Sequence, residues 1–240
     1  MNGLKNLNPN VSVDCVVFGF DNERLNVLLI EKKSDNTKHQ FALPGDLILE
    51  DESLDEAADR ILWELTSING IFLKQFHTFG DPNRVRDIKD LAWLQNYREN
   101  PQARVITVAY FALIKMGDFE PDASSFAERV FWCDINEVPP LAFDHNKIFN
   151  AALFRLRTDF ENQRTGFELL PDKFTLSHIQ NLYEMILGKK LDKRNFRKKL
   201  LKENLVLPTD EKQQGVLHKP ARLYAVNEEE VQIAPSAAAK

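Results

Sequence analysis

Two carboxylates and one guanidinium stand at fixed spacings in segment 43–68, LPGDLILEDESLDEAADRILWELTSI. Glu52 is followed eight positions later by Arg60 and four positions after that by Glu64. Carboxylate oxygens are the hard ligands that Mg²⁺ requires, and a site that hydrolyses a diphosphate needs several of them to hold the metal and activate water. Only Glu64 would lie beside Arg60 on a helix, and one carboxylate there is too few for that chemistry.

The surrounding residues predict a strand-to-helix loop followed by a helix. Ser53 and Glu56 have the spacing of a capping box, so the helix should run from near Ser53 to about Thr66. Its apolar residues recur at helical intervals: Leu54, Ala57, Ala58, Ile61, Leu62 and Leu65. An ordinary amphipathic helix behind a glycine turn is the simpler interpretation. The co-occurrence of Leu-Pro-Gly, the capping box, Arg60 and Glu64 favours a more specific one.

This segment resembles the Nudix box, whose pattern is Gly, five residues, Glu, seven residues, Arg-Glu, an aliphatic residue, any residue, Glu-Glu, any residue, Gly. Glu52, Arg60 and Glu64 match that pattern. The departures are Asp46 at the first glycine, Ile61 and Leu65 at two of the glutamates, and Ser67 at the last glycine. The resemblance implies a Nudix-type fold, and the departures predict that the fold is kept without the chemistry.

The charge is unevenly distributed along the chain. The 240 residues suffice for one large domain or two smaller ones, and the net charge is -5. Residues 167–228 hold 12 Lys and Arg against 8 Asp and Glu, which leaves -9 for the rest of the chain. Residues 189–202 hold eight basic residues against Asp192 alone. The whole-chain charge therefore hides a basic module.

The sequence shows no targeting or membrane signal. No apolar run approaches the length of a membrane span, and the start, MNGLKNLNPNVS, lacks the pattern of a signal peptide. Cys15 and Cys133 are far apart, which favours reduced, packed thiols over a disulfide between them. We therefore expect a cytoplasmic protein with no membrane partner.

The first part of the chain alternates strand-like runs with two helices. The expected strands are 12–20, 25–31, 71–79, 104–114 and 126–134, the first two joined as a hairpin and the fourth central. A second helix is expected at 144–160. Asp144 and His145 invite a catalytic or metal-binding interpretation. We expect them instead to begin and cap this helix, because no partner stands at ligand spacing nearby.

The long connection 80–102 has a short helix expected in its middle and could lie at the mouth of a pocket. Its polar and aromatic residues could contact a sugar, although a surface helix that buries Trp93 for packing is the simpler alternative. The candidate effector-binding residues are Asp46, Asp81, Arg84, Arg86 and Trp93.

The sequence pattern of the basic module predicts two helices followed by a hairpin. Thr175 can cap a helix that Gly188 ends, and Asp192 can cap a second, basic helix. Segments 204–207 and 216–226, joined by a bend at 208–215, then predict the wing of a winged helix. A solvated basic helix alone would be unremarkable, but the turn, cap and wing in order favour DNA binding. The candidate DNA-binding residues are Lys193, Arg194, Asn195, Arg197, Lys198, His218, Lys219 and Arg222.

A Nudix-like part with a broken box followed by a winged helix resembles the bacterial Nudix-related transcriptional regulators, most closely their arabinose-utilisation branch. The expected fold is α+β, with a Nudix-like α/β/α sandwich at 1–160, a winged helix-turn-helix at 161–228 and a flexible tail at 229–240. The resemblance implies a homodimer that binds double-stranded operator DNA, with no catalytic residues, no metal and no cofactor.

The resemblance also implies a repressor of sugar utilisation that a small effector, L-arabinose, releases from DNA. Helix 144–160 would carry the change between the domains. Two alternatives remain open: a regulator that responds to an ADP-ribose-type metabolite, and an active Nudix hydrolase with a DNA-binding module.

Overall fold

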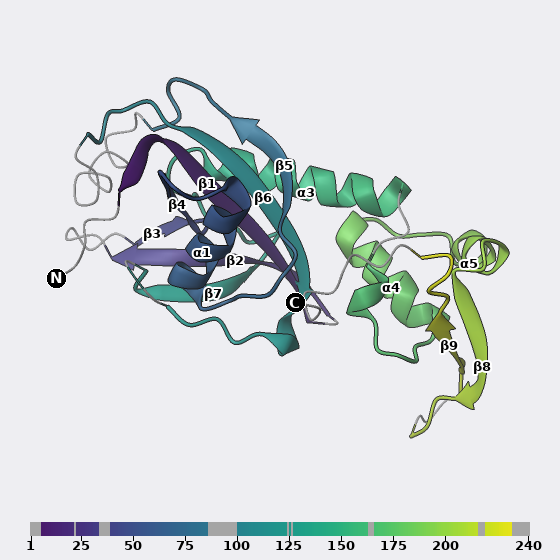
Figure 1. Ribbon diagram of the computed structural model, residues 1–240. Coiled ribbons are helices and arrows are strands. Elements are labelled where there is room, and N and C mark those ends of the chain that lie inside the picture. The colour runs from purple at the N-terminus through teal and green to yellow at the C-terminus, as the bar shows by residue number, and fades with distance from the viewer. Residues whose placement is uncertain are drawn as a thin grey trace. The chain divides into compact units, whose positions relative to one another are not determined.

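The computed structural model describes residues 6–21, 23–33, 39–85, 100–123, 125, 127–162, 166–215 and 219–231. The chain divides into two compact units, Met1–Leu153 and Phe154–Lys240 (Figure 1). The division falls inside helix α3 (His145–Asn162). Of the predicted site residues, Arg86, Trp93 and His218 lie outside the described residues, as does the helix expected within 80–102.

The first unit is built on a seven-stranded mixed sheet. Its strands are β1 (Leu7–Phe20), β2 (Leu25–Lys33), β3 (His39–Ala42), β4 (Gly45–Leu49), β5 (Lys74–Phe79), β6 (Ile106–Lys115) and β7 (Arg129–Asp134). The order is β3-β2-β1-β6-β5, with β4 paired to β1 and β7 paired to β2. β1 and β6 are parallel and the other pairs are antiparallel. The predicted hairpin and central strand are confirmed.

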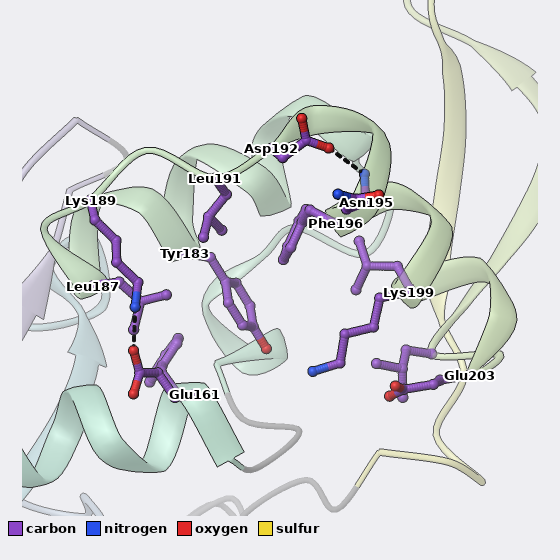
Figure 2. A pocket seen from close by; sticks show the side chains of 13 residues that line it. Glu161, Tyr183, Leu187, Lys189, Leu191, Asp192, Asn195, Phe196, Lys199 and Glu203 are labelled. Atoms are coloured by element: carbon purple, nitrogen blue, oxygen red, sulfur yellow. Dashed lines mark hydrogen bonds and ion pairs between the residues drawn. The ribbon is translucent and has the colours of Figure 1, made fainter.

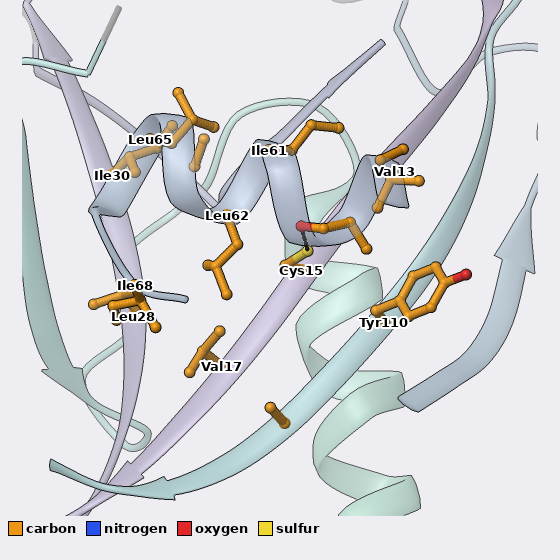
Figure 3. Close-up of a cluster of buried hydrophobic side chains, with 14 of the residues drawn as sticks. Val13, Cys15, Val17, Leu28, Ile30, Ile61, Leu62, Leu65, Ile68 and Tyr110 are labelled. Carbon is orange, nitrogen blue, oxygen red and sulfur yellow. Dashed lines mark hydrogen bonds between the residues drawn. The ribbon is translucent and has the colours of Figure 1, made fainter. Parts of the chain in front are cut away.

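Two helices cover opposite faces of this sheet. β1 is buried on both faces, which explains its continuous apolar run. On one face, Val13 and Cys15 belong to the same apolar cluster as the buried stripe of helix α1 (Leu54–Thr66), as Figure 3 shows. On the other face, Phe18 contacts Phe149 of α3 with ring centroids 6.3 Å apart. This layering confirms the predicted sandwich.

The ends of α1 follow local sequence signals. Ser53 is the N-cap, and its side chain and that of Glu56 form the reciprocal hydrogen bonds of the predicted capping box. The helix ends at Ser67, which adopts the left-handed conformation with φ 58°. The strand expected at 71–79 begins only at Lys74, and Ile68 and Ile71 before it belong to the apolar core.

The second unit has the predicted helix-turn-helix. It contains the short 3₁₀ helix η2 (Phe167–Leu169), helices α4 (Leu176–Leu187) and α5 (Lys193–Lys202), and strands β8 (Val206–Lys212) and β9 (Arg222–Val226). Thr175 and Asp192 cap the two helices with their side chains, and Gly188 ends α4 at φ 66°. All three predicted caps are confirmed.

The wing differs from the prediction in the extent of its strands. β8 continues through Pro208 to Lys212, where the sequence predicted a bend, and β9 begins at Arg222. The register shifts between Pro208 and Lys212. A two-stranded ribbon consists of edge strands, and an edge strand with a bulge tolerates a proline that cannot donate a hydrogen bond. The expected break at Pro208 was therefore wrong.

Both cysteines are free, so no disulfide joins Cys15 to Cys133. Burial raises the pKa of the Cys15 thiol, which keeps it protonated within the core. In the described part of the chain, no helix is both long enough and apolar enough to cross a membrane.

Candidate functional site

Arg60 connects the residues that match the Nudix box. Its guanidinium donates to both carboxylate oxygens of Glu52, at 2.8 and 2.6 Å, to Glu64 at 3.1 Å and to the Leu47 carbonyl at 3.2 Å. The hydrogen bond with Glu52 raises the pKa of Arg60 in spite of its partial burial. Glu52 also accepts a hydrogen bond from the Leu49 amide at 2.7 Å. The arginine therefore fastens α1 to the loop before it.

This arrangement does not fit a magnesium centre. Both remaining carboxylates, Glu52 and Glu64, are already paired with Arg60. Ile61 and Leu65, where the box has glutamates, are each 1% exposed and pack into the core. Among the described residues no three His, Cys, Asp or Glu side chains are grouped so that they could hold a metal ion. The box therefore supplies fewer carboxylates than a metal-dependent hydrolysis of a diphosphate uses.

A second arginine, Arg84, lies at the centre of a buried network. Its guanidinium forms a two-pronged contact with Asp144, with Nη2 at 2.8 Å and Nε at 3.2 Å, and Nη2 also lies 3.3 Å from Asp14. The side chains of all three residues are at most 6% exposed. His145 completes the network, with Nε2 3.4 Å from Asp14. Four residues from β1, the loop after β5 and the start of α3 thus meet in one place.

The network also holds the Leu-Pro-Gly segment before the box. Nδ1 of His145 accepts a hydrogen bond from the Leu43 amide at 3.0 Å, and Nε2 on the other side of the ring faces Asp14. Gly45 pairs with Asp14 in the sheet, and a Cβ at Gly45 would lie only 2.0 Å from an Asp14 oxygen. Glycine is required there because the carboxylate occupies the space that a side chain would need.

Asp14 is held in its charged form. Burial by itself would raise its pKa, but His145, Arg84 and a hydrogen bond with Thr107 outweigh burial and lower the pKa below the ordinary value of 3.8. His145 is the first residue of α3 and Asp144 precedes it, as predicted, but their side chains contact Arg84, Asp14 and the Leu43 amide and do not cap the helix. Their partners, Arg84 and Asp14, are remote in the sequence, so local spacing could not reveal them.

The described effector-binding candidates occupy different environments. Asp46 is half-buried in β4, next to Gly45, and accepts a hydrogen bond from the Leu47 amide. Asp81 is exposed and accepts a hydrogen bond from the Asn83 amide at 2.8 Å. Arg84 is buried in the network. Asp81 and Arg84 belong to one turn, in which the Arg84 amide donates to the Asp81 carbonyl.

In the second unit, α5 presents a basic surface. Lys193, Arg194, Asn195 and Lys198 are exposed on it. Arg197 is half-buried, and its Nη2 donates to Ser177 Oγ of α4 at 2.9 Å. On the wing, Lys219 and Arg222 are exposed. Exposed Lys and Arg on a helix and an adjacent ribbon suit contacts to DNA phosphates and base edges, and Arg197 also ties α5 to α4.

Glu184 fixes the turn between α4 and α5, a role that the sequence patterns did not indicate. Its carboxylate accepts hydrogen bonds from Lys190 at 2.7 Å, Gln180 at 2.9 Å and the Leu191 amide at 3.1 Å. These bonds, with Lys190 first, lower its pKa to about 2. An acidic residue in the last turn of a helix, where the helix dipole disfavours negative charge, was the available signal.

Comparisons with known proteins match both units. Residues 8–152 match the NUDIX domain family and residues 166–226 the NrtR DNA-binding winged helix domain. An ADPR responsive transcriptional repressor NtrR of Acinetobacter baylyi is 30% identical over 220 residues, 90% of this chain and 81% of that protein. Shewanella oneidensis NrtR has a similar structure, with TM-score 0.67, 28% identity, and 93% and 96% of the two chains covered.

Two further structures of the Shewanella protein carry ligands. The complex with a 27mer DNA gives TM-score 0.66 and 26% identity over 92% of this chain and 94% of that one. The NUDIX domain with ADP ribose gives TM-score 0.50 and 28% identity over 62% and 89% of the two chains. The chain described here therefore belongs to the NrtR-like Nudix-related transcriptional regulators, with a Nudix domain followed by an NrtR winged helix domain.

Proposed function

We propose that this protein is a transcriptional repressor whose Nudix domain binds ADP-ribose or a closely related diphosphate metabolite without hydrolysing it. The observation that carries the proposal is the Arg60 network, which occupies both remaining box carboxylates in a fold that otherwise retains the Nudix architecture. A domain that keeps the fold and loses the metal ligands is suited to sensing a ligand. The winged helix would convert the binding of this ligand into a change in DNA affinity.

The choice of effector rests on the relatives. The Acinetobacter baylyi protein is described as responsive to ADPR, and the Shewanella NUDIX domain was solved with ADP ribose. L-Arabinose, which the resemblance implied, has no such support among them. The ADP-ribose alternative therefore becomes the main hypothesis and L-arabinose becomes the comparison ligand in its test.

The test is a fluorescence anisotropy titration of the purified protein on DNA from upstream of its own gene. ADP-ribose should weaken binding by at least about fivefold, the lower range of a typical allosteric coupling. L-Arabinose at the same concentration should leave the affinity unchanged. Release by L-arabinose and not by ADP-ribose would reverse the assignment, and specific binding that ignores both ligands would remove the proposed sensor function.

The hydrolase alternative makes a separate prediction. Incubation of ADP-ribose with the protein and Mg²⁺ should give no AMP above the level without protein, because the box lacks its metal ligands. The variant to compare with the unmodified protein is Arg60→Gln, which removes the ion pairs that Arg60 forms with Glu52 and Glu64. Magnesium-dependent turnover by the unmodified protein would show that the departures from the box are compatible with catalysis.

We propose that the effector signal passes through α3. The helix starts at the Arg84 network in the first unit and continues into the second, so a ligand that moves the loop carrying Arg84 would also move the first turn of α3. Truncating buried Ile148 or Leu156 to Ala should reduce the effect of ADP-ribose on DNA affinity. An unchanged ratio of the affinities with and without ADP-ribose in both variants would exclude this route.

We further propose that the protein binds its operator as a homodimer, in which two winged helices reach two half-sites. Light scattering coupled to size exclusion should give twice the chain mass of 27.7 kDa. A monomer at the concentrations that bind DNA would require a different binding geometry.

A further inference from the structure

The second unit contains a pocket on the inner side of α5. It has a volume of about 590 Å³ and lies between α4, α5 and the last turn of α3, within residues 160–205 (Figure 2). Pockets that bind small molecules have volumes of about 300–1,000 Å³. This pocket therefore has room for a ligand of one or two fused rings and their substituents.

Three aromatic rings form one wall of the pocket. Tyr183 of α4 lies between Phe160 and Phe196, with centroid distances of 5.2 and 5.3 Å and interplanar angles of 63° and 55°. Tilted rings present both faces and edges, which favours contact with a planar ring over an aliphatic chain. Leu187, Leu191, Leu200 and Leu205 add apolar surface.

One cation in the lining, Lys199, has no ionic partner among the described residues. Lys199 extends toward Tyr183 in Figure 2, and it makes no ion pair or side-chain hydrogen bond with any residue that the structure describes. Burial, with the nearby charges of Glu168 and Glu203, raises the pKa of Tyr183, so its hydroxyl stays protonated. The Lys199 ammonium is the group in the lining that is placed to bind an anion beside the aromatic wall.

The acidic residues of the lining are in part already engaged. Glu161 pairs with Lys189 at one rim, and Asp192 caps α5 through the Asn195 amide. Glu203, one turn after Lys199, lines the same pocket and has an interaction of its own. The polar complement of the lining is therefore an anionic group at Lys199.

α5 has two functionally distinct faces. Asn195, Phe196 and Lys199 line the pocket, whereas Lys193, Arg194 and Lys198 do not, although Asn195 and Lys199 are exposed as well. Of the five candidate DNA-binding residues on α5, Asn195 alone lines the pocket. A bound ligand therefore leaves Lys193, Arg194 and Lys198 available to DNA.

We propose that the winged helix unit has a small-molecule site of its own, which takes a planar aromatic carboxylate between the Phe160–Tyr183–Phe196 wall and Lys199. This site is separate from the proposed ADP-ribose site, because every lining residue belongs to the second unit. Its occupant touches the inner face of the helix whose outer face meets DNA.

Isothermal titration calorimetry of the full chain with indole-3-carboxylate tests the site. The neutral indole-3-carboxamide should bind more weakly, and Lys199→Gln should weaken indole-3-carboxylate about tenfold, the value of one charge-assisted hydrogen bond of roughly 1.4 kcal/mol. Lys198→Gln is the matched control on the other face of the same helix and should leave the affinity unchanged. A thermal melt confirms that both variants fold.

A second titration repeats the calorimetry in the presence of saturating ADP-ribose. Indole-3-carboxylate should bind with the same affinity in its presence, because the two ligands occupy different units. No binding at millimolar concentration, equal affinity for Lys199→Gln and the unmodified protein, or competition by ADP-ribose would each overturn the proposal. None of these outcomes depends on DNA release, so failure here would leave the repressor function untouched.

Discussion

Two arginines in the Nudix domain make similar contacts in different surroundings. Arg60 pairs with Glu52 and Glu64 at the edge of the protein, where its side chain is 17% exposed, and Arg84 pairs with Asp144 and Asp14 at 4% exposure. Water can replace Arg60 as a partner of its carboxylates, but it cannot replace Arg84 in the buried network. We therefore expect the loss of Arg84 to destabilise the domain more than the loss of Arg60.

The largest effect is expected from Arg84→Ala. Removal of the guanidinium leaves Asp14 and Asp144 buried with too little positive charge, which costs about 3–5 kcal/mol of unfolding free energy. All three tryptophans of the sequence lie in the first unit, so tryptophan fluorescence during urea unfolding reports on this unit.

The control for Arg84 is Arg129→Ala in the same unit. Arg129 is 65% exposed and lies 3.4 Å from Glu31, so its loss should cost about 1 kcal/mol or less. Similar losses for the two variants would mean that the Arg84 network is open to water, and the contrast between the arginines would disappear.

The next largest effect on stability is expected at acidic pH, where Asp14 of the buried network takes up a proton. The pKa of Asp14 in the folded protein lies below its ordinary value of 3.8, so the unfolded chain takes up this proton first as the pH falls. The stability that Asp14 contributes is present above pH 3.8 and is lost as the pH falls toward the lower, folded-state pKa. Asp14→Asn should therefore reduce the slope of stability against pH below 3.8 by up to one proton, about 1.4 kcal/mol per pH unit. An unchanged slope in urea unfolding from pH 5 downward would contradict this.

Arg60→Ala should cost less than Arg84→Ala. The variant leaves Glu52 and Glu64 within reach of water, so we expect a loss of about 1–2 kcal/mol from the charge-assisted hydrogen bonds. The same urea experiment measures it, with Arg60→Lys as the companion that keeps the charge but not the two-pronged contact. A loss as large as that for Arg84→Ala would show that the box is sealed from water as tightly as the inner network.

The smallest effect is expected from Ser67→Gly, which restores the glycine of the box. Ser67 adopts φ 58°, a conformation that costs a residue with a side chain about 1–2 kcal/mol, and its hydroxyl donates only a 3.3 Å hydrogen bond to the Asp122 carbonyl. Glycine also gains entropy in the unfolded chain, so the net stabilisation should be at most about 1 kcal/mol. A destabilisation would mean that the serine hydroxyl matters more than the backbone strain.

Local sequence signals predicted most of the elements. Capping at Ser53, Thr175 and Asp192, the glycine end at Gly188 and the apolar periodicity of α1 and α4 all act within a few residues, so they can be read without the fold. The departures from the box could also be recognised in the sequence, because they concern residue identity at fixed positions. The extent of β8 could not be predicted, since tolerance of Pro208 depends on which strands pair.

The sequence by itself determined that the chain has a Nudix-like part with a broken box and a basic winged helix. The tertiary structure alone decided which charged residues are engaged. It joined Arg84 and Asp144 to Asp14, and it placed Lys199 in the lining of a pocket to which Lys198 does not contribute. The physical reason is that the cost of burying a charge depends on partners brought together by the sheet and helices, and those partners are remote in the sequence.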